Sequence, residues 1–164
     1  MKKLSCLIGA LLLCFSCRIA SAEGLVGVWK LVSYTTADPD TGEVFYPFGK
    51  NASGYILYTA GGRMAALLQA EGRKRFSAGN RISAPVEERA EAFSTSTAYT
   101  GTYTYTVDRV VHHVEVATNP DWLGSDQMRY PKVEGNRLTI TTPPLPTRPE
   151  GKLRVSVLVW DRVE

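Results

Sequence analysis

Two adjacent histidines and two nearby tyrosines are the residues of this chain best suited to chemistry. His112 and His113 lie in the run Val110 to Ala117, and Tyr103 and Tyr105 lie in the run just before it. An imidazole and a phenol hydroxyl can exchange a proton or bind a polar group. The set could therefore orient the polar end of a ligand, or act as a general acid or base without a metal or cofactor.

The turn at Asp108-Arg109 predicts which of these side chains share a face. Pairing the flanking segments across it places Tyr105 opposite His112 and Tyr103 opposite Val114, and residues opposite one another share a face. The rest of this predicted inner face consists of three valines, Val107, Val110 and Val116. The inward histidine is either a hydrogen-bonded core residue or a contact to a ligand, and the sequence leaves both readings open.

A second turn at Gly135-Asn136 predicts that Arg129 and Gln127 also face the interior, toward the loop that contains Trp122. The same face carries Val133, Leu138 and Ile140. Burying an unpaired arginine costs free energy. Arg129 therefore implies a carboxylate partner, an anionic ligand or a wet barrel mouth, unless Pro131 disrupts the register and turns it outward.

The Gly61-Gly62 turn gives a weaker signal, because both faces of its strands are apolar. A two-residue loop places Tyr55 and Leu57 on the same face as Met64, with Ile56 and Tyr58 opposite. Met64 could line a pocket, since methionine adapts to varied shapes, or it could be simple packing.

The elements that must position these residues are short runs rich in Val, Ile, Tyr and Thr, separated by Gly, Pro, Asn and Asp. This texture is typical of strands joined by tight turns. The expected strands are Val28 to Thr35, Glu43 to Tyr46, Gly54 to Ala60, Arg63 to Gln69, Gly101 to Val107, Val110 to Ala117, Gln127 to Glu134, Arg137 to Thr142, and Lys152 to Val163.

One helix is expected in the middle of the chain, from Pro85 to about Tyr99, with proline and acidic residues in its first turn. A single helix among so many strands excludes an alternating βαβ chain. The fold predicted is all-β, an up-and-down antiparallel barrel of eight to nine strands with one inserted helix.

Residues 1–22 have the pattern of a signal peptide, with two lysines, an apolar run and the small-residue site Ala20-Ser21-Ala22. The predicted mature domain is residues 23–164, exported to the periplasm or secreted, without a transmembrane segment. Phe15-Ser16-Cys17 faintly resembles a lipobox, so a lipid anchor on Cys17 is the alternative.

Charge and cysteine content narrow the function classes. The leader holds Lys2, Lys3 and Arg18 but no acid, so 19 basic and 16 acidic residues become 16 of each in the mature chain. This balance gives no reason to expect nucleic-acid binding, which depends on neutralising phosphates. All three cysteines lie in the leader, so no disulfide is expected, and no motif for a metal, cofactor or activated nucleophile is present.

The chain resembles the lipocalin-like domain family of bacteria and fungi, whose fold is a calycin-type β-barrel. Gly27 and Trp29 near the start of the first strand and Arg162 near the end of the last are similar to the lipocalin signature. Further similarity lies in residues 27–34, 46–49, 99–103, 112–115 and 119–127. The resemblance implies that Trp29 and Arg162 stack at the closed end of the barrel, and it implies no particular chemistry.

The leading hypothesis is a protein that binds one small hydrophobic or amphipathic molecule inside the barrel. The candidate ligand contacts are Tyr103, Tyr105, His112, Met64, Trp122, Gln127 and Arg129. The alternative is a cofactor-independent isomerase, cyclase or hydratase that uses His112 with Tyr103 or Tyr105. The basic cluster Arg73-Lys74-Arg75 is either a solvated loop or a lid over an anionic ligand. The sequence does not predict the oligomeric state.

Overall fold

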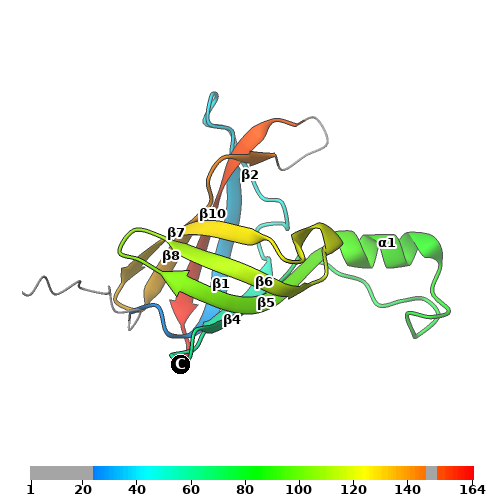
Figure 1. The fold of residues 1–164 in the computed structure, drawn as a ribbon. Helices are drawn as coiled ribbons and strands as arrows, with labels where there is room; N and C mark the ends of the chain where they lie inside the picture. The colour runs from blue at the N-terminus through cyan, green and yellow to red at the C-terminus, as the bar shows by residue number, and fades with distance from the viewer. Residues whose placement is uncertain (1–23, 147–150) are drawn as a thin grey trace, which may run out of the picture.

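The computed structural model describes residues 24–146 and 151–164. The predicted signal peptide and Cys17 lie outside these residues. Within them, eight long antiparallel strands form a closed barrel, and one α-helix lies outside it (Figure 1). The predicted all-β barrel is confirmed.

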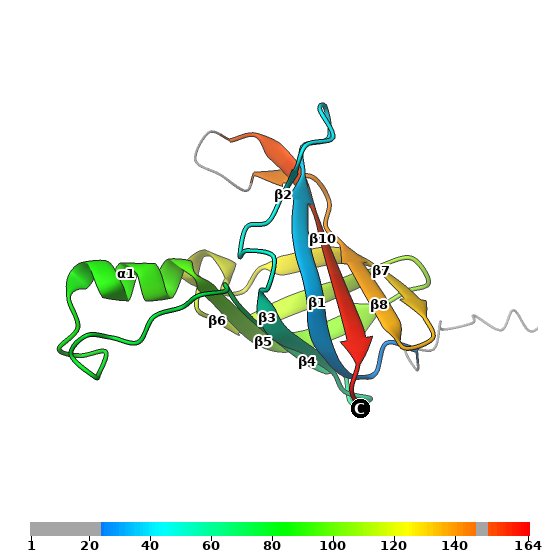
Figure 2. The same cartoon turned by 180° about the vertical axis from the view of Figure 1, so that it is seen from behind.

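The barrel follows sequence order and then closes on its first strand. The barrel strands are β1 (Gly27–Ala37), β3 (Ser53–Tyr58), β4 (Arg63–Gln69), β5 (Ser96–Tyr105), β6 (Val110–Ala117), β7 (Asp126–Glu134), β8 (Arg137–Thr141) and β10 (Leu153–Arg162). Pairing of β1 with β10 closes the cylinder, as Figure 2 shows. Two short strands, β2 (Val44–Phe45) and β9 (Leu145–Pro146), extend the sheet beside β1 and β10.

One end of the barrel is closed by the side chains that the lipocalin resemblance singled out. Trp29 is fully buried, and its indole N–H donates to the carbonyl of Leu25 over 2.9 Å. The guanidinium of Arg162 lies 4.0 Å from the Trp29 ring centroid and donates to the carbonyls of Val26 and Gly24 at 2.6 and 2.7 Å. The Trp–Arg stack therefore joins the chain before β1 to the end of β10.

The helix α1 (Val86–Ser94) and the loop before it project from the barrel as an arm (Figure 1). None of the nine helical residues is buried. The predicted extension of the helix to Tyr99 is wrong, because β5 begins at Ser96. The Ser/Thr-rich segment after Ser94 contains β-branched and aromatic residues, which favour a strand once a neighbouring strand is available for pairing.

The Gly61-Gly62 turn differs from the two-residue loop expected. Thr59 and Arg63 pair around a three-residue loop that ends at Gly62, where φ is +78°. This left-handed glycine produces the bulged hairpin typical of three-residue loops. The register moves by one residue, so Tyr58 pairs with Met64 and points inward, whereas the predicted grouping of Tyr55 and Leu57 with Met64 is wrong.

The β5–β6 hairpin keeps the predicted faces but not the predicted pairs. Tyr103 lies opposite His112 and Tyr105 lies opposite Val110, because the loop between them contains four residues. The two-residue difference leaves the inner face unchanged. Two of the predicted inner valines are nevertheless exposed: Val107 lies in the turn, and Val116 follows a bulge opposite Gly101 that reverses the alternation.

The expected register at Gly135-Asn136 is confirmed. Val133 pairs with Leu138, and Pro131 pairs with Ile140 without shifting the ladder. Arg129 consequently faces inward and is buried.

We predict that Gly101→Ala lowers the free energy of unfolding by about 1–3 kcal/mol, the usual cost of overpacking. A Cβ atom on Gly101 would lie 1.9 Å from the backbone carbonyl oxygen of His113. Urea denaturation should leave the control Gly61→Ala within about 0.5 kcal/mol of wild type, since the nearest atom to a Cβ there is 3.9 Å away. Equal stability of the two variants would contradict the close approach at the bulge.

Candidate functional site

A cavity of about 450 Å³ is lined by inward-facing residues of the barrel. Its lining includes Thr97 and Tyr99 near the start of β5, and it includes neither Trp29 nor Arg162. Its apolar lining consists of Phe48, Ile56, Ala66, Leu68, Trp122, Ile140, Leu145, Pro146, Leu158 and Trp160. Its polar lining consists of Tyr34, Thr97, Tyr99, His112, Gln127, Arg129, Thr142 and Ser156. The barrel is therefore incompletely filled by its own side chains.

The 3₁₀-helix η2 (Pro120–Trp122) places one aromatic wall of the cavity. Asn119 caps it by accepting from the backbone N–H of Asp121 at 3.1 Å, and Pro120 occupies the first turn. Both features are typical of a helix start. The Trp122 ring then meets Tyr99 edge to face, with centroids 5.4 Å apart.

His112 lies at the inner wall of the cavity, held between two tyrosines. Its Nε2 is 2.7 Å from the hydroxyl of Tyr58, and its Nδ1 is 2.9 Å from the hydroxyl of Tyr99. A neutral imidazole has one donor and one acceptor nitrogen, so one hydroxyl accepts and the other donates. Both ring nitrogens are thus satisfied within the barrel.

Burial is the main reason that the pKa of His112 falls from 6.5 to about 3, with the nearby positive charge of Arg129 adding to the effect. The imidazole is therefore neutral at physiological pH. Burial likewise raises the pKa of Tyr99 and raises that of Tyr58 well above its usual value. The whole triad is uncharged.

Sequence reasoning missed Tyr99 and Tyr58 as partners of His112. The expected helix includes Tyr99, and the expected register of the Gly61-Gly62 hairpin places Tyr58 on the face opposite Met64 instead of beside it. The alternation of Tyr99, Gly101 and Tyr103 at period two is the signal that would have extended β5 to include Tyr99.

The seven predicted ligand contacts separate into two groups. Trp122, His112, Gln127 and Arg129 line the cavity. Met64, Tyr103 and Tyr105 are absent from the cavity lining: the buried Tyr103 donates to the carbonyl of Thr59 at 2.8 Å, Met64 is buried against the core, and half-buried Tyr105 packs at its edge.

Arg129 is the only charged residue in the lining of this cavity. Its guanidinium donates to the carbonyl of Met128 at 2.7 Å and to the side-chain oxygen of Gln127 at 3.3 Å. The Gln127 amide in turn donates to the hydroxyl of Ser125 at 2.9 Å. Neighbouring polar groups thus hold the side chain at the cavity wall.

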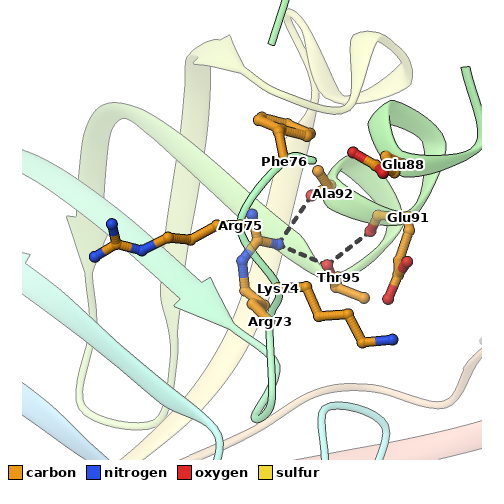
Figure 3. A pocket seen from close by; sticks show the side chains of 8 residues that line it. All are labelled: Arg73, Lys74, Arg75, Phe76, Glu88, Glu91, Ala92 and Thr95. Atoms are coloured by element: carbon orange, nitrogen blue, oxygen red, sulfur yellow. Dashed lines mark hydrogen bonds between the residues drawn. The ribbon is translucent and has the colours of Figure 1, made fainter. Parts of the chain in front are cut away.

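The basic cluster of residues 73–75 lies on the projecting arm, in a shallow cleft against α1 (Figure 3). Arg73 donates to the carbonyl of Ala92 at 2.9 Å and to the hydroxyl of Thr95 at 2.6 Å, so it caps the carboxyl end of the helix. Arg75 extends away from the helix in Figure 3. None of residues 70–95 lines the barrel cavity.

Across the part of the chain that the structure describes, no three His, Cys, Asp or Glu residues are grouped so that they could hold a metal ion. In the same residues, no helix is long and apolar enough to cross a membrane.

A closed antiparallel barrel, sealed at one end by a Trp–Arg stack and hollow toward the other, defines a cavity-enclosing β-barrel protein. The family model of the lipocalin-like domain matches residues 26–163, and the chain belongs to that family. Comparisons with curated proteins and with solved structures gave no match.

We predict that Tyr58→Phe lowers the free energy of unfolding by about 1–3 kcal/mol, because it leaves a buried nitrogen of His112 without its partner. Tyr55→Phe is the matched control, since Tyr55 lies in the same strand on the exposed face. Chemical denaturation of both variants measures the difference. Equal stabilities would show that the Tyr58 hydrogen bond contributes nothing.

The pH dependence of stability should carry the signature of a buried neutral histidine. Between pH 6.5 and about 3 the unfolded chain binds a proton that folded His112 does not, so the stability lost on acidification approaches 1.4 kcal/mol per pH unit. Above pH 6.5 this contribution is fully present. NMR titration of the imidazole, assigned with the His113→Gln variant, should show His112 neutral at pH 5; protonation near pH 6.5 would contradict the burial argument.

Proposed function

We propose that this protein binds one small hydrophobic or amphipathic molecule inside its barrel. The cavity carries the proposal, because ten of its lining residues are apolar and eight polar residues lie among them. Its volume of about 450 Å³ falls within the range of small-molecule sites, roughly 300–1,000 Å³. A barrel of eight strands has room for a single small ligand.

The cavity walls suggest how such a molecule is oriented. Ile56, Ala66 and Trp160 form apolar surface in the barrel interior, and Trp122 supplies an aromatic face beside Tyr99. Gln127 and Arg129 supply donors at the wall. The ligand places its apolar body against the first set and a polar end near the second. Tyr103, Tyr105 and Met64 act indirectly, by packing the barrel beneath and beside the cavity.

Binding is favoured over the catalytic alternative by the state of His112. An isomerase, cyclase or hydratase using this residue requires it to exchange a proton with the substrate. Both of its nitrogens already bond to tyrosines, and its pKa of about 3 makes it a poor base near neutral pH. The imidazole has the features of a structural residue that fixes Tyr99 at the cavity wall.

The proposed place of action is outside the cytoplasm. The pattern of residues 1–22 supports export to the periplasm or secretion, with a mature domain starting at Glu23. A lipid anchor at Cys17 is the alternative route, and either would deliver the same barrel.

We predict that the purified mature protein retains a stoichiometric small-molecule adduct after incubation with a lipid and metabolite extract. Native mass spectrometry measures the adduct. Ala66→Leu should remove most of it, because Ala66 lines the cavity and a larger side chain takes the ligand's space.

Ala65→Leu is the control, since Ala65 is the next residue of β4 and points to the outer face. Circular dichroism and denaturation should first show that both variants are folded. An adduct that persists equally in Ala66→Leu would place the ligand outside the barrel, and absence of any adduct from wild type would count against the proposed function.

A further inference from the structure

We infer that the polar end of the ligand is an anion of carboxylate type, paired with the guanidinium of Arg129. The inference deepens the proposed function and rests on it. The observation that carries it is a buried cation, 8% exposed, that faces a cavity and has no carboxylate partner among the residues described.

The groups around Arg129 provide no compensating negative charge. No aspartate or glutamate lines the cavity. The ionisable groups that its charge reaches are Tyr34, Tyr58, Tyr99 and His112, and burial holds the pKa values of the tyrosines above their usual range and that of the histidine below it. All four are neutral near pH 7, so no negative charge in the cavity lining balances the cation.

The guanidinium also keeps hydrogen-bonding capacity for a ligand. An arginine side chain has five N–H donors in a planar fork. The bonds to Met128 and Gln127, together with the hydrogen bond to the Tyr99 hydroxyl, hold the side chain in place and leave the remaining donors for a ligand. A carboxylate matches this fork in charge and geometry, and the pair gains strength where water is excluded.

Two arginines on the outside of the barrel have the carboxylate partner that Arg129 lacks. Arg137 on β8 bonds to Asp161 on β10 at 2.8 Å, and Arg63 on β4 pairs with Glu115 on β6. Both pairs are exposed to solvent, where an unpaired charge would cost little. Arg129 is buried without such a partner, which costs far more. A bound anion would reduce this cost and balance the charge of Arg129.

The ligand class that follows is a small monocarboxylate with an apolar body. Its carboxylate meets Arg129, and its body lies along the apolar wall formed by Ile56, Ala66 and Trp160. A doubly charged molecule would leave one negative charge in a cavity whose lining offers a single cation.

Decanoate and decan-1-ol test the inference, because they share a ten-carbon body and differ in charge. Isothermal titration calorimetry at pH 7.5 should show that the wild-type protein binds decanoate at least tenfold more tightly than decan-1-ol. Arg129→Gln should reduce decanoate affinity at least tenfold and change decan-1-ol affinity less than threefold. Arg129→Lys should retain part of the preference, since it keeps the charge but loses the fork.

Arg137→Gln is the matched control and should bind both probes as wild type does, because Arg137 lies on the outer face.

Thermal unfolding distinguishes a binding role of Arg129 from a structural one. A structural role predicts that replacing Arg129 lowers the unfolding temperature, whereas a binding role predicts that the temperature stays the same or rises. Without ligand, Arg129→Met should unfold at or above the wild-type temperature, because an unpaired buried charge is removed. A large drop in that temperature would assign Arg129 to stability and overturn the inference.

Equal affinity of the wild-type protein for the two probes would overturn the anion pairing and leave the barrel as a binding site for neutral molecules. Binding of neither probe would overturn the inference and, with no adduct in the extract experiment, the proposed function as well.

Discussion

The pairing of β1 with β10 is the constraint on which the rest of the structure depends. An open sheet of this length would expose unpaired backbone groups along both edges. Closure pairs these long edges with each other. It also encloses the side chains that point inward from every strand. The Trp29–Arg162 stack reinforces the closure at one end, because its hydrogen bonds join the segment before β1 to the end of β10.

Closure also determines which polar groups must find partners inside. His112 lies on an inward strand position, so both of its nitrogens must be satisfied without water. Tyr58 from β3 and Tyr99 from β5 supply the two hydroxyls across the barrel. The resulting neutral triad fixes three strands relative to one another and leaves the remaining volume beside it as a cavity.

Arg129 differs from His112, because the charge of its side chain is not compensated inside the barrel. Its neighbours hold it in position but supply no opposite charge, so the site sacrifices stability that an apolar residue would provide. Such a sacrifice is typical of functional sites, where binding competes with the optimum for folding. The projecting arm of residues 70–95 stands apart from this balance, because none of its residues lines the cavity.

Local patterns in the sequence predict the all-β class and most strand positions, because period-two alternation and turn residues act locally. The family is indicated separately, by the resemblance of Gly27, Trp29 and Arg162 to the lipocalin signature. The sequence also placed His112 and Arg129 on the inner face, since strand alternation survives a shift of two residues, as at the β5–β6 turn. The tertiary structure alone decided which tyrosines meet His112. Tyr58 depends on the left-handed Gly62, which moves its hairpin by one residue, and Tyr99 depends on pairing with β4, which turns a helix-like segment into a strand. The meeting of these side chains also requires contacts between distant segments, because Tyr58 and His112 are 54 residues apart in the chain.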